Sequence, residues 1–121
     1  MKISFHKPIL PNSLDDIYTE SLRSGWLTTG PEVKKFESNL INIFNSENVV
    51  GLNSCTAALH LALKAKGYGP GDKLIAPTYT FVATVEVGEY LGMQCELIDS
   101  DQEGFNLDLN LIEDRLKLDN S

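Results

Sequence analysis

Two patterns of secondary structure meet in the segment Val49-Val50-Gly51-Leu52-Asn53-Ser54-Cys55-Thr56-Ala57. Its first four residues are a short apolar run, which predicts a buried strand. Asn53 and Ser54 are favoured N-cap residues, and residues 56–66, rich in alanine and leucine, predict a buried helix that Gly67 ends. A strand that leads directly into a helix is the first half of a βαβ unit.

The same alternation continues toward the C-terminus. Residues 73–76 and 94–99 predict two further strands, while residues 81–91 and 107–118 predict two further helices. The order strand, helix, strand, helix, strand is typical of parallel strands joined by right-handed crossovers. The expected fold class is therefore α/β, with a mostly parallel sheet as the middle of three layers.

Residues 1–46 show a different organisation. An extended arm that contains Pro8 and Pro11 precedes two helices, predicted from Ser13 to Gly25 and from Pro31 to Phe44. We therefore divide the chain into an arm with two helices, residues 1–46, and a βαβαβ unit with a final helix, residues 47–121. Three strands are few for such a sheet, so we expect a truncated, N-terminal portion of a larger domain.

Composition and charge argue against several classes of function. The chain is 42% hydrophobic and 22% charged, as globular proteins are, and its net charge is −7. An acidic chain without a polybasic run is poorly suited to nucleic acid. Two cysteines do not make a disulfide framework or a zinc site, so no metal is expected. Without a signal peptide or an apolar run long enough to span a membrane, the expected location is the cytoplasm, with no membrane partner.

Two turns are expected at the edge of the sheet where ligands bind in open parallel sheets, beyond the carboxyl ends of the strands. In the first, the helix that follows Asn53 presents free N–H groups and the positive end of its dipole, so it favours an anion. The hydroxyl of Ser54 or Thr56 can add a donor. The alternative interpretation is an ordinary N-cap without a ligand. Neither of the usual glycine-rich phosphate loops is present.

The second turn, Pro77–Thr84, brings the aromatic ring of Phe81 to the same edge. A flat apolar ring beside a phosphate site is what a planar aromatic cofactor needs. The alternative is that Phe81 packs inward at the start of a helix, as an isolated phenylalanine usually does.

Five stretches of the chain together resemble one known family. They are Gly25–Pro31, Asn53–Leu63, Gly69–Asp72, Pro77–Thr84 and Gly92–Asp101. In these stretches the chain is similar to the N-terminal third or so of the DegT/DnrJ/EryC1/StrS family of nucleotide-sugar aminotransferases, which depend on pyridoxal 5′-phosphate (PLP). The resemblance implies the start of the large domain of a fold-type-I PLP-dependent transferase.

The resemblance also implies a cofactor site in the two turns. Thr56 and Ala57, with Ser54 and Cys55 in the same turn, would bind the phosphate of PLP, and Phe81 would stack on its ring. A segment at the active-site entrance is matched by Thr29 and Gly30, which are secondary candidates for substrate contacts.

Four side chains also have structural interpretations. Asp99 and Asp101 match a recurring acidic pair to which we assign no chemistry, and we interpret them as loop or capping residues. We interpret Cys55 and His60 as packed side chains of the protein interior.

No catalytic residue is expected among these 121 residues. A PLP-dependent aminotransferase needs a lysine that forms a Schiff base and a carboxylate at the pyridinium nitrogen. Lys73 begins its strand at the opposite edge, and Lys64 and Lys66 lie toward the far end of their helix. The resemblance places the catalytic lysine and the carboxylate beyond residue 121.

The function implied by the resemblance is the transfer of an amino group, usually from glutamate, to a nucleotide-linked keto-sugar. The products would serve cell-surface polysaccharide or secondary-metabolite biosynthesis, with PLP and pyridoxamine 5′-phosphate (PMP) as the two forms of the cofactor and a homodimer as the full-length protein. One alternative is a PMP-dependent sugar dehydratase of the same family, in which a histidine replaces the lysine. Another is a non-catalytic fragment or regulatory protein that binds phosphate or cofactor.

Overall fold

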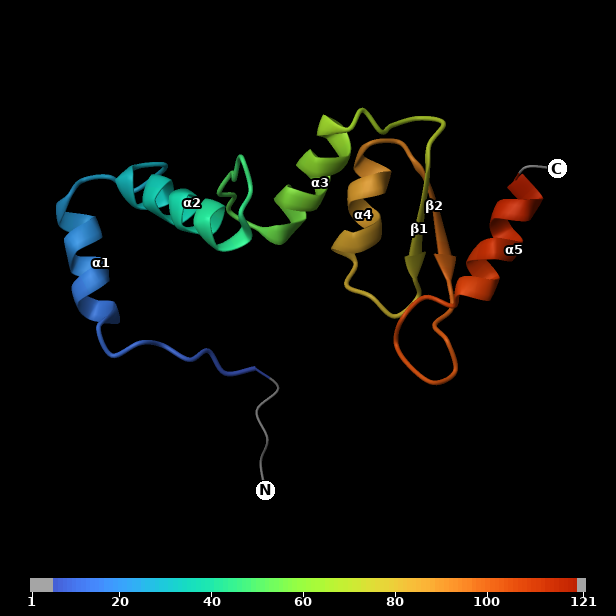
Figure 1. Cartoon of the computed structure of the whole chain (residues 1–121), viewed down its shortest axis with the longest axis horizontal. Helices are drawn as coiled ribbons and strands as arrows, with labels where there is room; N and C mark the ends of the chain where they lie inside the picture. The colour runs from blue at the N-terminus through green and yellow to red at the C-terminus, as the bar shows by residue number, and fades with distance from the viewer. Residues whose placement is uncertain (1–5, 120–121) are drawn as a thin grey trace, which may run out of the picture. The chain divides into compact units, whose positions relative to one another are not determined.

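The computed structural model describes residues 6–119, so the first five residues of the predicted arm and the last two residues of the chain lie outside it. The chain forms two compact units, an N-terminal unit that ends at Gly51 and a C-terminal unit that begins at Leu52 (Figure 1). None of the helices within residues 6–119 is long and apolar enough to cross a membrane.

The N-terminal unit contains two helices, α1 (Leu14–Arg23) and α2 (Pro31–Phe44). Both confirm the predicted segments. Helix α1 ends at Arg23, two residues before Gly25, whose φ of +77° lies in the left-handed region that glycine adopts without steric cost. Helix α2 begins with Pro31, because a proline at the first helical position loses no intrahelical hydrogen bond.

The strand predicted at residues 49–52 does not form, and this prediction is wrong. These residues have no regular secondary structure, and the two strands of the described sheet pair only with each other. The N–H of Gly51 instead donates to Glu37 Oε1 of α2 at 2.7 Å. An apolar β-branched run has the composition of a strand, but a strand exists only where a neighbour accepts its backbone hydrogen bonds.

The C-terminal unit follows the predicted alternation from its first helix onward. Its elements are α3 (Cys55–Ala65), β1 (Lys73–Pro77), α4 (Ala83–Tyr90), β2 (Gln94–Ile98) and α5 (Leu109–Asp119). The strands are parallel, in a register that pairs Lys73 with Gln94 and Pro77 with Ile98. The expected α/β class with a parallel sheet is confirmed, with two strands rather than three in the described residues.

Helices lie on both faces of the two strands, as Figure 1 shows. Helix α4 approaches one face so closely that a Cβ atom on Gly88 would lie 2.7 Å from Cys95 Sγ. On the other face, Arg115 of α5 forms an ion pair with Glu96 of β2, with 2.8 Å between Nε and Oε1. The buried hydrophobic core consists of small and medium side chains: Ala76, Ala83, Val87, Met93 and Ile98.

Helix α3 packs against α4, where the rings of His60 and Tyr90 lie 5.9 Å apart. No residue of α3 is buried, so the prediction of a buried helix is wrong for the described residues. Leu59 and Leu61 remain 39% and 48% exposed because α4 covers only one side of α3. Helix propensity and capping are local, so they predicted the helix itself correctly. Burial depends on neighbouring elements, and within the described residues too few of these cover α3.

Candidate functional site

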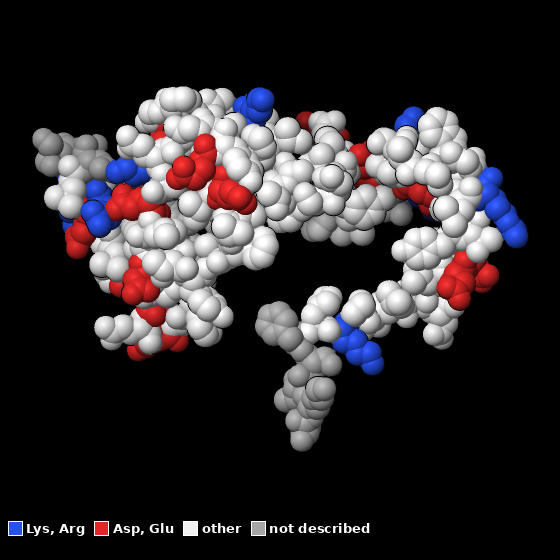
Figure 2. Space-filling view, turned by 180° about the vertical axis from the view of Figure 1, so that it is seen from behind, with Lys and Arg blue, Asp and Glu red and all other residues white. Residues whose placement is uncertain are grey.

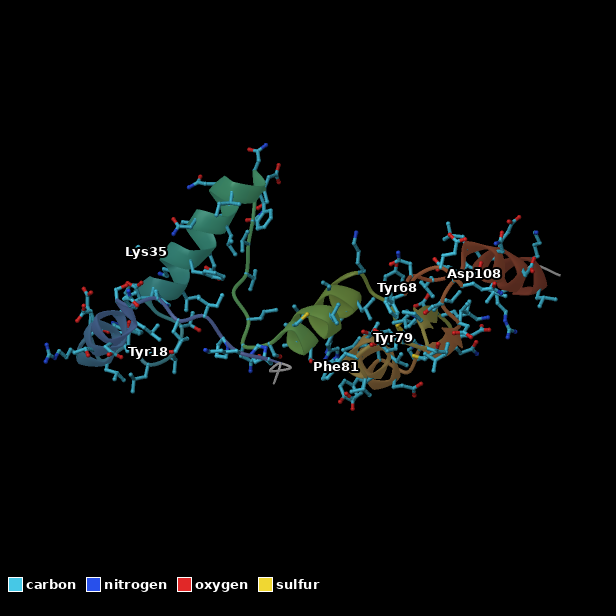
Figure 3. All side chains as sticks on the ribbon, turned by 90° about the horizontal axis from the view of Figure 1, so that it is seen from below. Tyr18, Lys35, Tyr68, Tyr79, Phe81 and Asp108 are labelled. Carbon is cyan, nitrogen blue, oxygen red and sulfur yellow. The ribbon has the colours of Figure 1, made fainter. Side chains whose placement is uncertain are left out.

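The candidate site lies where β1 and β2 end, at the carboxyl edge of the sheet. Helices α3 and α4 both begin at this end of the C-terminal unit (Figure 1). Figure 3 views the same end from below and shows Tyr79 and Phe81 there. Both turns predicted to carry the site therefore belong to one compact unit. They lie at the carboxyl edge of the strands, where parallel sheets usually bind ligands.

The first turn is an N-cap that leaves two donors without a partner. Ser54 Oγ accepts a hydrogen bond from the N–H of Ala57 at 3.1 Å. The N–H groups of Cys55 and Thr56 have no acceptor among the described residues, as expected for the first positions of a helix. An anion at this terminus would meet these two N–H groups and the hydroxyl of the half-buried Thr56.

This geometry changes the predicted role of Ala57. The family resemblance implies Thr56 and Ala57 as phosphate ligands, but the N–H of Ala57 is already used by the cap. The donors that remain are one residue earlier, at Cys55 and Thr56. Cys55 itself is exposed and unbridged, so its interpretation as a buried thiol is wrong. Its backbone N–H is one of the two donors without a partner among the described residues.

The charges around the two helix starts favour α3 over α4 as the anion site. The first turn of α3 carries no acidic side chain, whereas the first turn of α4 contains Glu86. A carboxylate at a helix N-terminus offsets the positive end of the dipole and repels a second anion. The hydroxyl of Tyr90 is hydrogen-bonded to Glu86, which raises the pKa of Tyr90 above its ordinary value.

Within residues 52–119, the turns after β1 and β2 and the first turns of α3 and α4 contain no lysine or arginine. In α5 they are paired with carboxylates, as in the contact of 2.9 Å between Lys117 Nζ and Glu113 Oε1. On the face shown in Figure 2, lysine and arginine side chains are interspersed with acidic ones rather than gathered in one patch. Anion binding at α3 would therefore depend on backbone N–H groups and the helix dipole.

The second turn places Phe81 at the surface. Its side chain is 75% exposed, so the alternative interpretation, in which it packs inward, is not what the structure shows. Residues 78–81 line an open cavity of about 380 Å³. Helix α4 begins only at Ala83, two residues later than predicted, and this leaves Phe81 in the turn rather than on a helix face.

Hydrogen bonds between side chains hold this turn. Thr78 Oγ1 donates to Asp99 Oδ1 at 3.1 Å, and the hydroxyls of Thr80 and Thr84 lie 2.9 Å apart. Asp101 accepts a hydrogen bond from the N–H of Glu103 at 3.1 Å. Asp99 and Asp101 are thus loop residues with defined partners, as the capping interpretation predicts.

An aromatic pair lies next to the turn. The rings of Tyr79 and Phe105 are 5.2 Å apart, and both side chains are more than 70% exposed. Phe105 belongs to the loop after β2, so the pair joins the loops that follow the two strands. No sequence pattern indicates this contact, because the two residues are far apart along the chain.

The two cysteines differ in environment. Cys95, on β2, is half-buried against α4, and its Sγ lies 3.6 Å from the carbonyl oxygen of Val85. Burial, with a smaller effect of the neighbouring Glu89 carboxylate, raises the pKa of the Cys95 thiol. A raised pKa lowers the thiolate fraction, so Cys95 is not an activated nucleophile.

Thr29 and Gly30 belong to the N-terminal unit. Thr29 is exposed, while Gly30 is buried and precedes α2 as its N-cap residue. A Cβ atom on Gly30 would lie 3.0 Å from Trp26 Cβ, so the glycine allows the tryptophan to fold back over the start of α2. Trp26 and Gly30 line a cavity of about 450 Å³ between residues of α1 and α2.

Comparison with known proteins identifies the family. The model of the DegT/DnrJ/EryC1/StrS aminotransferase family matches residues 10–118. The chain belongs to this family. The predicted resemblance is confirmed over nearly the whole chain, including the two turns at the carboxyl edge.

Two curated relatives illustrate the similarity. The chain is 44% identical over 90 residues to the spore coat polysaccharide biosynthesis protein SpsC of Bacillus subtilis. It is 40% identical over 92 residues to the UDP-4-amino-4-deoxy-L-arabinose–oxoglutarate aminotransferase of Shewanella sediminis. These matches cover 74% and 76% of the chain but 23% and 24% of the relatives. The chain thus spans about a quarter of the length of the curated relatives it matches.

Solved structures of the family share the fold. The PLP form of Spr1654 from Streptococcus pneumoniae matches with a TM-score of 0.86 and 35% identity, over 94% of this chain and 29% of that one. A DegT/DnrJ/EryC1/StrS aminotransferase from Brucella abortus matches with a TM-score of 0.77 and 31% identity, over 84% and 27% of the two chains. The GDP-4-keto-6-deoxy-D-mannose-3-dehydratase of Escherichia coli, at 21% identity and a TM-score of 0.79, has the same fold.

Proposed function

We propose that the protein to which these residues belong is a PLP-dependent aminotransferase that acts on a nucleotide-linked keto-sugar. The observation that carries the proposal is the pair of features at one sheet edge, the two unpartnered N–H groups at the start of α3 and the exposed ring of Phe81. Family membership gives this pair its chemical meaning, because the S. sediminis relative is named as a UDP-sugar aminotransferase and Spr1654 was solved in a PLP form.

The residues present fit PLP. A phosphate needs donors rather than a buried cation, and the N–H groups of Cys55 and Thr56 are available without rearrangement. The Thr56 hydroxyl adds a third donor, and Ser54 fixes the helix start through its bond to Ala57. Phe81 covers one face of the ring and excludes water from it. When bound, PLP supplies an electron sink that makes amino transfer possible.

The catalytic lysine and the carboxylate at the pyridinium nitrogen are proposed to come from residues outside these 121. Lys73 begins β1, at the edge opposite the site, and Lys64 lies in the last turn of α3. Neither position suits a group that must reach the cofactor carbon. Thr29 and Gly30 remain proposed contacts to the substrate.

The finer features of the proposal are supported by the family and its relatives. Glutamate is the proposed amino donor. The sugar product is proposed to serve a cell-surface polysaccharide, which is supported by the name of the B. subtilis relative. We also propose a cytoplasmic homodimer. Exposed apolar side chains on α2, where Ile43 and Phe44 are 70% and 71% exposed, support further protein contacts for this unit.

The test uses the full-length protein, PLP and L-glutamate. The proposal expects bound PLP to be converted to PMP, with one 2-oxoglutarate released per site. A nucleotide-linked keto-sugar added next should regenerate PLP and gain an amine. Binding of PMP with loss of a sugar hydroxyl and no amine would instead support the dehydratase, and the absence of cofactor binding would contradict both enzymes.

A second measurement tests the phosphate site itself. PLP and pyridoxal, which lacks the phosphate, are compared in the unsubstituted protein and in a Thr56→Val variant. Loss of the Thr56 hydroxyl should weaken PLP binding and leave pyridoxal binding unchanged. Equal weakening of both ligands would place the phosphate elsewhere.

A further inference from the structure

One acidic side chain ties the turn that carries Phe81 to the second strand. Asp99 Oδ1 accepts hydrogen bonds from Thr78 Oγ1 at 3.1 Å and from the N–H of Ser100 at 2.8 Å. The N–H of Thr78 also donates to the carbonyl oxygen of Ile98 at 2.9 Å. Thr78 is therefore held to the end of β2 by both its backbone and its side chain, three residues before Phe81.

A second hydrogen bond holds the turn at Thr80, the residue before Phe81. The hydroxyl of Thr80 is 2.9 Å from that of Thr84, in the first turn of α4. The turn is thus fixed to β2 through Thr78 and to α4 through Thr80. Phe81 follows directly after the second of these anchors.

Packing does not fix the position of Phe81. Its side chain is 75% exposed, and the flanking Tyr79 and Val82 are 71% and 63% exposed. A turn without buried side chains retains conformational freedom, and a ligand that orders it loses binding free energy. Hydrogen bonds to the rigid elements on either side are the means left to hold the ring in one place.

We propose that Asp99 is a positioning residue that, by holding Thr78, presents the Phe81 ring to a flat cofactor at the carboxyl edge. This role rests on the proposed function, because Phe81 meets such a ring only in a protein that binds PLP. Asp99 itself contacts the turn and not the cofactor. Asp101, the other carboxylate of the same loop, bonds to the N–H of Glu103 and provides a matched control.

The experiment measures the PLP dissociation constant and the visible circular dichroism of bound PLP in the full-length protein. Asp99→Ala removes the acceptor and Thr78→Val removes the donor. Asp99→Asn and Thr78→Ser keep the acceptor and the donor in place. Asp101→Ala removes a carboxylate of the same loop that does not touch Thr78.

Asp99→Ala and Thr78→Val should each weaken PLP binding by about threefold to tenfold, which corresponds to the loss of one hydrogen bond. The double variant should be no weaker than either single variant. Asp99→Asn, Thr78→Ser and Asp101→Ala should stay within about twofold of the unsubstituted protein. The dichroism of bound PLP should fall only in the first two variants, because it reports the orientation of the ring.

Two results would overturn the positioning role. One is an equal loss of affinity in Asp99→Ala and Asp101→Ala. The other is a full effect of Asp99→Ala in a Phe81→Ala background, where no ring remains to be positioned. If Phe81→Ala weakens PLP binding and Asp99→Ala does not, the proposed function stands and the role of Asp99 fails.

A measurement without cofactor tests the hydrogen-bonded frame separately. Amide hydrogen exchange at residues 79–84 of the apo protein should be faster in Thr78→Val than in Thr78→Ser. Equal exchange would refute the frame whatever the protein binds. Failure of the unsubstituted protein to bind PLP would overturn the proposed function, and with it the role of Asp99 toward the cofactor.

Discussion

Replacing Gly88 by alanine tests how closely α4 lies on the sheet. The new Cβ atom would lie 2.7 Å from Cys95 Sγ and 3.1 Å from Leu74 Cδ1. The leucine methyl is the end of a flexible side chain and can move, but the sulfur sits one bond from Cβ on β2. Alanine improves helix propensity by about 1 kcal/mol, whereas overpacking a fitted interface costs about 1–3 kcal/mol. We expect a net loss of about 1 kcal/mol in the free energy of unfolding.

The assay is denaturant unfolding of the full-length protein, with two companion variants. Cys95→Ala removes the clashing sulfur, so Gly88→Ala should cost less in that background than alone. Gly69→Ala is the control, since its Cβ atom would find only the carbonyl oxygen of Leu91, at an ordinary 3.5 Å. A Gly88→Ala variant as stable as the unsubstituted protein would refute the close approach of α4 to β2.

Three further predictions follow. Ser54→Ala removes the acceptor for the N–H of Ala57, which should destabilise α3 by about 1 kcal/mol in thermal unfolding, and Ser54→Asp should retain the cap. Phe81→Ala should weaken PLP binding by about 1 kcal/mol or more in a fluorescence titration, and unchanged affinity in a folded variant would remove the ring from the site. Because the pKa of Cys95 is raised, its thiolate fraction at pH 8 is smaller in the native than in the urea-unfolded protein. Iodoacetamide should therefore modify it more slowly in the native protein, and the midpoint of the pH–rate profile should lie at higher pH.

The parts of the fold that depend on local chemistry were predicted from the sequence. Pro31 and Gly25 set the start of α2 and the end of α1, and Ser54 caps α3 as expected. These signals act over a few residues, so a single chain contains all the information they need.

The parts that depend on distant neighbours were not predicted. Residues 49–52 have strand composition but no partner, and α3 is apolar on several sides while α4 covers one. Cys55 is exposed for the same reason. A sequence pattern indicates which side chains suit burial. Burial itself requires a neighbouring surface that covers them, and α3 is covered mainly by α4 within the described residues.

The candidate site shows the same division. The proposed anion site at the start of α3 rests on a helix N-terminus, a local feature that the sequence predicts. The bond between Thr78 and Asp99 spans 21 residues and depends on the parallel register of β1 and β2, which no local pattern specifies. The exposure of Phe81 required the late start of α4 at Ala83.

The most direct test of the account is a crystal structure of the full-length protein with PLP. We predict phosphate oxygens within hydrogen-bonding distance, about 2.7–3.2 Å, of the backbone nitrogens of Cys55 and Thr56, and the pyridine ring against Phe81. The bond from the N–H of Ala57 to Ser54 Oγ should persist beside them. A phosphate bound away from the start of α3, or a ring with no contact to Phe81, would contradict the central claim.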